Sequence, residues 1–367
     1  MKTRLFPDNS LLHGNRAWIR LGDGALVACA LALLWAASAW GSEQGSATGQ
    51  SVVNLPVSFA VHNTNTSKDP CYSDGADYTV KGHISAPQGS LATGHGNVIT
   101  IYLYGYEGGE WNWHLQGVPS YDYAAEMAKL GHASLTIDEL GYGASGRPQD
   151  GNLTCQGAEA DITHQIVQML RHGTYQLGSG HGVDFKKIVL AGHDIGGQVA
   201  DIEAYSYSDI DGLLIMTFAD QGFTPWIIER ATIAANDWCT TSPTGYVHYV
   251  SAEEWRTLLF YDADPRVVDA TEALRNPNPC GIIRSTPPAV PGDKALDSRI
   301  TVPVLVVFGD RDTLVWDRAG EEQQKDNYGS SDKTTAFIPN AGHFVMFEKT
   351  APRLRTTVSD WLESRFH

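Results

Sequence analysis

Short apolar runs alternate with longer amphipathic segments from Val52 to the end of the chain. The apolar runs predict β-strands at Val57–Val61, Tyr78–Ile84, Val98–Tyr104, Ala133–Ile137, Lys187–Ala191, Gly212–Phe218, Val302–Phe308 and Thr334–Ile338. The amphipathic segments predict helices at Tyr121–Leu130, Ala158–Arg171, Gly196–Tyr205 and Ala351–Phe366. Strands with almost no polar position, such as Val302–Phe308, are typical of a sheet that is covered on both faces. The alternation therefore predicts an α/β fold with a doubly wound, mostly parallel sheet.

One segment interrupts this alternation. Residues 219–299 separate two predicted strands and are much longer than the roughly dozen residues that a crossover connection needs. The segment is rich in aromatic residues and ends in a proline-rich stretch: Trp226, Trp238, Tyr246, Tyr249, Trp255, Tyr261, Pro277, Pro279, Pro287, Pro288 and Pro291. We therefore predict a core of residues 52–218 and 300–367 and an inserted helical cap of residues 219–299.

The first residues have the pattern of an export signal. Basic residues precede an apolar run from Ala25 to Ala37, which is followed by the small residues Ala37-Ser38-Ala39. The run is shorter than the ~20 apolar residues of a membrane span. We predict a signal peptide at residues 1–39 and a disordered polar linker at residues 40–51; an uncleaved anchor is the alternative. The mature protein would then be secreted or periplasmic, without stable membrane association.

The cysteine content and the net charge indicate which bonds, cofactors and partners to expect. Removal of the signal leaves Cys71, Cys155, Cys239 and Cys280, and an even number in an exported protein predicts two disulfides. Three pairings are possible; we favour Cys71–Cys155 and Cys239–Cys280, because each pair then lies within one region of the chain. No CxxC or His/Cys cluster indicates zinc, so we expect no metal and no cofactor. The net charge of −16 argues against nucleic acid and leaves a small molecule as the expected partner.

The segment Gly192-His193-Asp194-Ile195-Gly196 lies between a predicted strand and a predicted helix. A G-x-D-x-G sequence in this position has the spacing of a nucleophile elbow, with aspartate where serine is common. The glycines permit a tight turn that presents Asp194 at a helix N-terminus, where negative charge is favoured. Asp194 is therefore a candidate ionised nucleophile. The alternative is an ordinary helix N-cap.

Two later loops carry the residues that would complete such a site. Asp310 and Asp312 follow the strand Val302–Phe308, and His343 follows the strand Thr334–Ile338. The order nucleophile, acid, histidine is that of an α/β-hydrolase triad, and each member comes after a strand, where open α/β sheets place their sites.

With these residues the chain resembles the α/β-hydrolase superfamily from about Val52 onward. Residues 138–145 fit its D-x-x-G-x-G-x-S turn, and the sequence GHDIGG at residues 192–197 is similar to the elbow of its aspartate-nucleophile branch, the epoxide hydrolases and dehalogenases. The resemblance implies that Asp194 forms an alkyl ester, that His343 activates the water that hydrolyses it, and that Asp312 orients His343. Asp312 is preferred to Asp310 because the family's acid usually lies three residues past the glycine that follows the strand, here Gly309.

The loop after the third predicted strand would supply one oxyanion donor. The backbone N–H groups of Tyr106 and Ile195 are the candidates. Epoxide hydrolases usually have His-Gly-x-Pro here, whereas this chain has Tyr104-Gly105-Tyr106-Glu107. Nearby, Trp111 and Trp113 either approach the pocket or pack in the core, and Glu107, Glu139, His114 and His193 are interpreted as structural or solvated.

The reaction class depends on the residues around Asp194. Many haloalkane dehalogenases have tryptophan after the nucleophile, and Ile195 counts against that class. Epoxide opening needs acidic hydroxyls over the ring oxygen, for which Tyr246, Tyr249 and Tyr261 of the cap are candidates; each could instead only pack the cap. The sequence favours an epoxide hydrolase-like enzyme. The alternatives are a dehalogenase, an esterase or lactonase lineage with a replaced serine, and a non-catalytic binding protein of the same fold.

Overall fold

A computed structural model describes residues 51–91, 98–312 and 314–367. The predicted signal peptide and all of the predicted linker except Ser51 lie outside the described residues. Within them, no helix is both long and apolar enough to cross a membrane.

The core of the chain is a ten-stranded sheet with the order β12-β11-β8-β7-β3-β4-β2-β1-β5-β6. Its strands are β1 (Val52–His62), β2 (Asp77–Pro87), β3 (Val98–Leu103), β4 (Ser134–Asp138), β5 (Gln176–Leu177), β6 (Gly180–His181), β7 (Lys187–His193), β8 (Gly212–Met216), β11 (Val304–Gly309) and β12 (Lys333–Ile338). The strands from β4 to β12 in this order pair in parallel, while β2 is antiparallel to both β4 and β1. The predicted mostly parallel sheet is confirmed.

Alternate residues of the central strands enter two different hydrophobic cores. In β11, Val304 and Val306 pack on one face of the sheet, together with Ile162. Leu305 and Val307 pack on the other face, together with Leu354. The sheet is therefore covered on both sides, as its continuous apolar strands predict.

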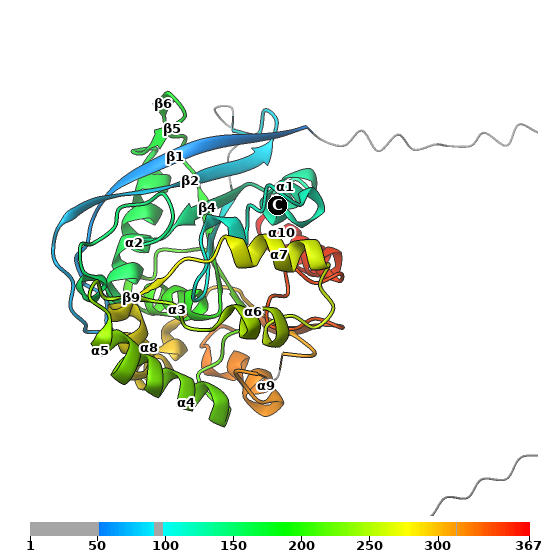
Figure 1. The fold of residues 1–367 in the computed structure, drawn as a ribbon. Helices are drawn as coiled ribbons and strands as arrows, with labels where there is room; N and C mark the ends of the chain where they lie inside the picture. The colour runs from blue at the N-terminus through cyan, green and yellow to red at the C-terminus, as the bar shows by residue number, and fades with distance from the viewer. Residues whose placement is uncertain (1–50, 92–97, 313) are drawn as a thin grey trace, which may run out of the picture. The chain divides into compact units, whose positions relative to one another are not determined.

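Helices cover both faces of this sheet (Figure 1). They are α1 (Tyr123–Lys129), α2 (Gln156–His172), α3 (Ile195–Tyr207), α9 (Arg318–Asn327) and α10 (Ala351–Phe366). Helices α2 and α3 pack together, and so do α1 and α10. The four predicted helices are present, with ends that differ by a few residues from the prediction. Helix α9 was not predicted, because its sequence is mostly polar and its apolar stripe is weak.

Residues 219–299 form several short helices and one small two-stranded sheet. The elements are α4 (Pro225–Ile233), the π-helical turn η4 (Ala234–Trp238), α5 (Cys239–Thr241), β9 (Tyr246–Val247), α6 (Ala252–Leu258), α7 (Pro265–Ala273), β10 (Asn278–Pro279), α8 (Cys280–Leu296) and η5 (Asp297–Arg299). In Figure 1, α4, α5, α6 and α8 gather at the end of the view opposite β1 and β2. The proline-rich stretch is part of α8 and was not expected to be helical.

Both favoured disulfides are present. Cys71 is bonded to Cys155, the N-cap residue of α2. Cys239 at the start of α5 is bonded to Cys280 at the start of α8. The second bond joins two helices of the segment 219–299, and the first fastens the loop after β1 to the core.

Candidate active site

Asp194 lies in the turn between β7 and α3 with φ 53° and ψ −130°, a backbone conformation that residues other than glycine rarely adopt. Its N–H donates to the carbonyl of Met216 at 2.9 Å, which ties the turn to β8. A Cβ atom at Gly196 would lie 2.6 Å from the carbonyl oxygen of Tyr104. Glycine is therefore required there, and the strained turn holds the carboxylate at the carboxyl end of the sheet.

The two oxygens of the Asp194 carboxylate have different surroundings. Oδ2 accepts a hydrogen bond from the backbone N–H of Tyr106 at 3.2 Å. Oδ1 lies 3.8 Å from Nε2 of His343. Burial raises the pKa of Asp194, and the charge of His343 and the N–H groups of Tyr106 and Ile195 offset part of the rise. One oxygen is thus held by the backbone N–H of Tyr106, one of the two predicted oxyanion donors, while the other faces the imidazole.

His343 is connected on its other side to Asp312. Nδ1 of His343 lies 3.0 Å from Oδ2 of Asp312, whose side chain is buried. Burial alone would lower the pKa of His343, but the negative charge and hydrogen bond of Asp312, with Asp194, raise it overall. Asp310 instead accepts the backbone N–H of Asn340 at 2.7 Å. The structure brings Asp194, His343 and Asp312 together and excludes Asp310 from the group.

His193 supports the imidazole from behind. Its Nε2 lies 3.0 Å from the carbonyl oxygen of His343, and its ring is fully buried. Burial and the charge of His343 lower the pKa of His193 well below its usual range, so its ring is neutral and donates to this carbonyl. It is absent from the pocket lining, in agreement with the predicted structural role.

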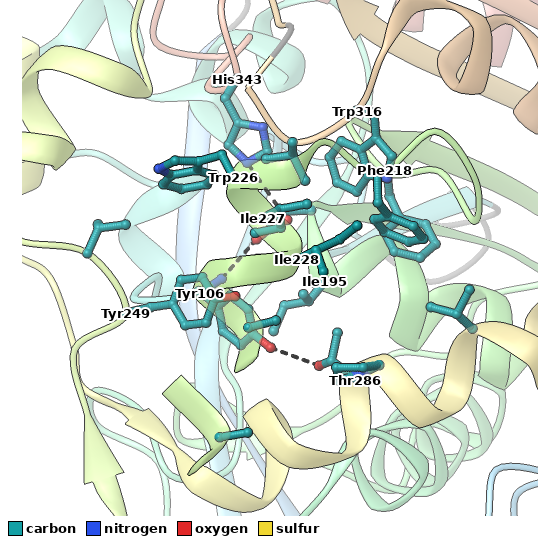
Figure 2. Close-up of a pocket in the computed structure, with 18 of the residues that line it drawn as sticks. Tyr106, Ile195, Phe218, Trp226, Ile227, Ile228, Tyr249, Thr286, Trp316 and His343 are labelled. Carbon is teal, nitrogen blue, oxygen red and sulfur yellow. Dashed lines mark hydrogen bonds and ion pairs between the residues drawn. The ribbon is translucent and has the colours of Figure 1, made fainter. Parts of the chain in front are cut away.

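A cavity of about 560 Å³ opens in front of Asp194 and His343. Its walls are mainly apolar and come from the core loops and from α4 and α8: Phe218, Trp226, Ile227, Pro287, Pro288 and Trp316 are among them. Figure 2 shows Trp226 and Trp316 near His343, with Ile227 and Ile228 between them and the tyrosines. A pocket of this size and character fits a small apolar molecule. Among the described residues, the groups close enough to hold a metal ion lie outside this lining.

Of the three predicted cap tyrosines, only Tyr249 lines the cavity. Its hydroxyl has no hydrogen-bond partner among the described residues, and burial together with the charge of Asp194 raises its pKa. Tyr246 donates to the carbonyl oxygen of Pro148 at 2.9 Å, and Tyr261 is 55% exposed beside Arg311. The structure places Tyr246 and Tyr261 outside the cavity lining: Tyr246 is in β9, which pairs with β10, and Tyr261 follows α6.

The second tyrosine in the cavity comes from the core. The ring of Tyr106 stacks on that of Tyr249 with centroids 4.3 Å apart, and its hydroxyl donates to Oγ1 of Thr286 at 2.9 Å (Figure 2). From the sequence, only the backbone of Tyr106 was expected in the site. No local pattern could have indicated Thr286, which reaches the cavity from the middle of α8.

Glu107 connects this loop to the segment 219–299. Its carboxylate is completely buried and accepts the backbone N–H groups of Tyr249 and Val250. It also forms an ion pair with Arg275, whose side chain is only 8% exposed. The predicted structural role of Glu107 fits these contacts.

The other residues near this edge are part of the scaffold. Nε1 of Trp113 donates to the carbonyl oxygen of Leu103 at 3.0 Å, and Trp111 packs against Trp255 and Phe347, so neither lines the cavity. Glu139 accepts the N–H of Tyr104 at 3.0 Å. His114 lies 2.9 Å from Asp122, the N-cap residue of α1.

The sheet order, the elbow at Asp194 and the approach of His343 and Asp312 define an α/β-hydrolase architecture. Comparison with protein families agrees, because residues 95–354 match the Alpha/beta hydrolase family. The chain belongs to this family. Comparison with curated proteins returns no match.

Solved structures with the same fold include three enzymes of low sequence identity. An esterase from Thermogutta terrifontis is 19% identical, with a TM-score of 0.59 over 84% of this chain and 100% of the other. A monoacylglycerol lipase from Paleococcus ferrophilus is 17% identical, with a TM-score of 0.55 over 73% and 94%. A putative aryl esterase from Burkholderia cenocepacia is 18% identical, with a TM-score of 0.55 over 84% and 98%. At these identities the likeness extends to the fold alone.

Proposed function

We propose that this chain is a hydrolase in which Asp194 attacks an electrophilic carbon of a small apolar substrate, with epoxides as the substrate class. The observation that carries the proposal is the orientation of one carboxylate. Its Oδ2 is held by the N–H of Tyr106, and its Oδ1 lies 3.8 Å from Nε2 of His343. An ionised carboxylate in this position is a nucleophile towards saturated carbon.

The proposed reaction has two steps. Oδ1 of Asp194 forms a bond to a ring carbon of the epoxide, the C–O bond of the ring breaks, and its electron pair goes to the ring oxygen. Nε2 of His343 then takes a proton from water, and the resulting hydroxide attacks Cγ of the ester. The negative oxygen of the tetrahedral intermediate accepts the N–H groups of Tyr106 and Ile195. When the intermediate collapses, the bond from Cγ to the glycol oxygen breaks, this oxygen takes the proton from Nε2 of His343, and the diol is released. The proton left on the Asp194 carboxyl group returns through solvent to the acid of the first step.

Tyr249 is the proposed acid of the first step. The developing alkoxide needs a proton donor, and the unpaired hydroxyl of Tyr249 lies in the same cavity as Asp194. Its raised pKa keeps the phenol protonated at neutral pH. The cavity contains no second hydroxyl from the positions predicted for the cap, so Tyr106, stacked on Tyr249, is the proposed partner.

We further propose that the protein works outside the cytoplasm on a small molecule. The N-terminal sequence has the pattern of an export signal, and two disulfides fit an oxidising compartment. The net charge of −16 speaks against nucleic acid as a partner.

A single turnover in ¹⁸O-labelled water tests the mechanism, with styrene oxide as the probe. The ester pathway places the label in Asp194, because water attacks Cγ and the diol keeps the original carboxylate oxygen. Peptide mass spectrometry locates the label. His343→Gln should accumulate a protein heavier by the mass of the epoxide, and Asp310→Asn is the matched control that should turn over normally.

The alternative functions predict different results in the same assays. Label that appears only in the diol would exclude the alkyl ester. Turnover of a 1-chloroalkane but not of styrene oxide would identify a dehalogenase. Carboxylate attack on an ester gives a reactive anhydride, so hydrolysis of p-nitrophenyl esters that survives Asp194→Ala would indicate a different site. Tight ligand binding without turnover would indicate a binding protein.

A further inference from the structure

Three buried aspartates from distant parts of the sequence lie together behind the elbow helix. Asp201 is on α3, Asp220 follows β8, and Asp297 begins η5. Each offers a carboxylate oxygen within 4.8 Å of those of the other two. All three residues have 0% exposure. None of them lines the cavity in front of Asp194, so the cluster is separate from the proposed active site.

Four oxygens of this cluster have no hydrogen-bond partner within the part of the chain that the structure describes. They are Oδ1 of Asp201, Oδ1 of Asp220 and both carboxylate oxygens of Asp297. Buried polar atoms without partners are rare in folded proteins, because burial removes the water that would otherwise bind them. The oxygens of Asp297 can therefore be satisfied only by a proton shared with Asp220 or by a cation between the carboxylates.

Donors from α9 and its C-terminal side orient the remaining oxygens. Tyr328 donates its hydroxyl proton to Oδ2 of Asp201 at 3.2 Å. Nε2 of Gln324 donates to Oδ2 of Asp220 at 2.9 Å, and Nδ2 of Asn327 donates to the same oxygen at 3.3 Å. Outer hydrogen bonds of this kind fix the orientation of metal-ligating carboxylates.

No basic side chain of the described residues pairs with the three carboxylates. A fourth carboxylate, Asp293, lies nearby and is held by Nε2 of Gln198 at 2.8 Å and by the hydroxyl of Tyr205 at 2.9 Å. Several buried carboxylates this close together repel strongly when they are ionised, so the group must either hold protons or bind a cation.

We propose that Asp201, Asp220 and Asp297 bind one calcium ion. The donors are all carboxylate oxygens, which hard divalent cations prefer over nitrogen and sulfur ligands. Ca²⁺ takes oxygens at about 2.3–2.6 Å in flexible geometry, so three oxygens within 4.8 Å of one another can share one ion. Mg²⁺ demands near-octahedral geometry and keeps several waters, so a buried group of protein carboxylates favours Ca²⁺.

The ion would fasten the end of the inserted segment to the core. Asp297 is in η5, directly after α8, whereas Asp201 is on the helix that begins beside Asp194. Helices α3, α8 and α9 are labelled in Figure 1. Helix α8 carries Thr286 and the prolines of the cavity wall. The expected role of the ion is therefore structural, since it would hold this wall against the core. No metal was expected from the sequence, which lacks a CxxC or His/Cys cluster, and the three aspartates share no local spacing that would indicate a site.

Metal binding to the purified full chain tests this proposal. The protein is stripped with EDTA, dialysed and titrated with CaCl₂ and separately with MgCl₂ in a calorimeter, and its Tm is measured with and without each ion. We expect one Ca²⁺ per chain, a higher Tm in CaCl₂ and weaker binding of Mg²⁺. Asp297→Asn should weaken Ca²⁺ binding by about 10-fold or more. Asp360→Asn, at an exposed carboxylate of α10, is the control and should bind Ca²⁺ normally.

The opposite result would be equally clear. If CaCl₂ gives no binding heat and neither CaCl₂ nor EDTA changes the Tm, the cluster holds protons and the proposal is overturned. In that case Asp297→Asn should stabilise the protein at pH 8, because it removes a buried carboxyl group that would otherwise ionise. If Asp297→Asn does not fold, the calcium stoichiometry of the unmodified protein decides between the two outcomes.

Discussion

At the scale of single residues, the strained backbone of Asp194 determines what the site can do. A residue at φ 53° costs about 1–3 kcal/mol unless its surroundings hold it in place. The hydrogen bond to Met216 and the glycine at position 196 supply that support. The same turn fixes the carboxylate against the N–H of Tyr106, so its free oxygen is aimed before any substrate arrives.

Replacement of Asp312 by Asn should separate the two proposed steps. The variant keeps the size of the side chain but loses the charge that stabilises protonated His343. We expect ester hydrolysis to slow by roughly 10³–10⁴-fold while ester formation changes far less, so that the ester accumulates. Rapid-quench mass spectrometry of the protein measures both steps. Equal slowing of the two steps would show that Asp312 acts on more than the imidazole.

Glu321 on α9 predicts a pH dependence of stability. Burial, followed by the charge of Asp312, raises the pKa of Glu321 to about 8, although Arg318 lies 2.9 Å away. Because this pKa is higher in the folded than in the unfolded chain, the folded state binds the additional proton. This proton stabilises the folded state fully at pH values below the pKa of Glu321 in the unfolded chain, 4.5. The stabilisation is lost as the pH rises towards the pKa in the folded chain, about 8.

Glu321→Gln cannot ionise and should remove this dependence. Urea unfolding at pH 6 and pH 9 should show a smaller loss of stability in the variant than in the unmodified protein. Glu363→Gln, at an exposed glutamate of α10, should behave like the unmodified protein. Parallel curves for the unmodified protein and Glu321→Gln would contradict the raised pKa.

At the scale of elements, the cavity depends on how the segment 219–299 is attached to the core loops. Glu107 makes this attachment through the N–H groups of Tyr249 and Val250 and through Arg275. Its backbone also has a positive φ of 63°. One buried carboxylate thereby positions the tyrosine that we propose as the acid.

Glu107→Gln should loosen the attachment. The change leaves Arg275 buried without its charge partner, and loss of one partner of a buried ion pair typically costs about 3–5 kcal/mol. We expect a lower Tm and a higher KM for an epoxide substrate. Asp269→Asn breaks the exposed pair with Arg256 in the same segment and should cost no more than about 1 kcal/mol. Equal effects of the two changes would show that Glu107 does not anchor the segment.

The elements also show what the sequence could and could not predict. Eight strands of the main sheet were predicted because each is a local apolar run, whereas the two-residue strands β5 and β6 were not. The elbow was predicted because Gly192 and Gly196 flank Asp194 two residues away on each side. The cap tyrosines could not be chosen, because Tyr246 is fixed by pairing with Pro279 and Tyr249 by Glu107, both far away in the chain. Helix α8 was missed because prolines usually interrupt helices.

At the scale of the whole molecule, the core loops and the segment 219–299 place Asp194 and His343 together in a mainly apolar cavity. Burial raises the pKa of Asp194, while Asp312 and Asp194 raise that of His343 in spite of its burial. The proposed first step needs ionised Asp194, and the second needs neutral His343. Because the ordinary pKa of histidine is far above that of aspartate, His343 should control activity at low pH.

The profile of kcat against pH should therefore fall on its acid side with an apparent pKa above 6.5, the ordinary value for His343. The sign follows from the chemistry, since a protonated imidazole cannot take a proton from water. Asp312→Asn removes the negative charge that raises this pKa and should move the acid limb to lower pH. Circular dichroism at each pH separates this effect from unfolding. An acid limb centred near pH 4, unchanged in Asp312→Asn, would assign control to Asp194 and contradict the proposed role of His343 as base.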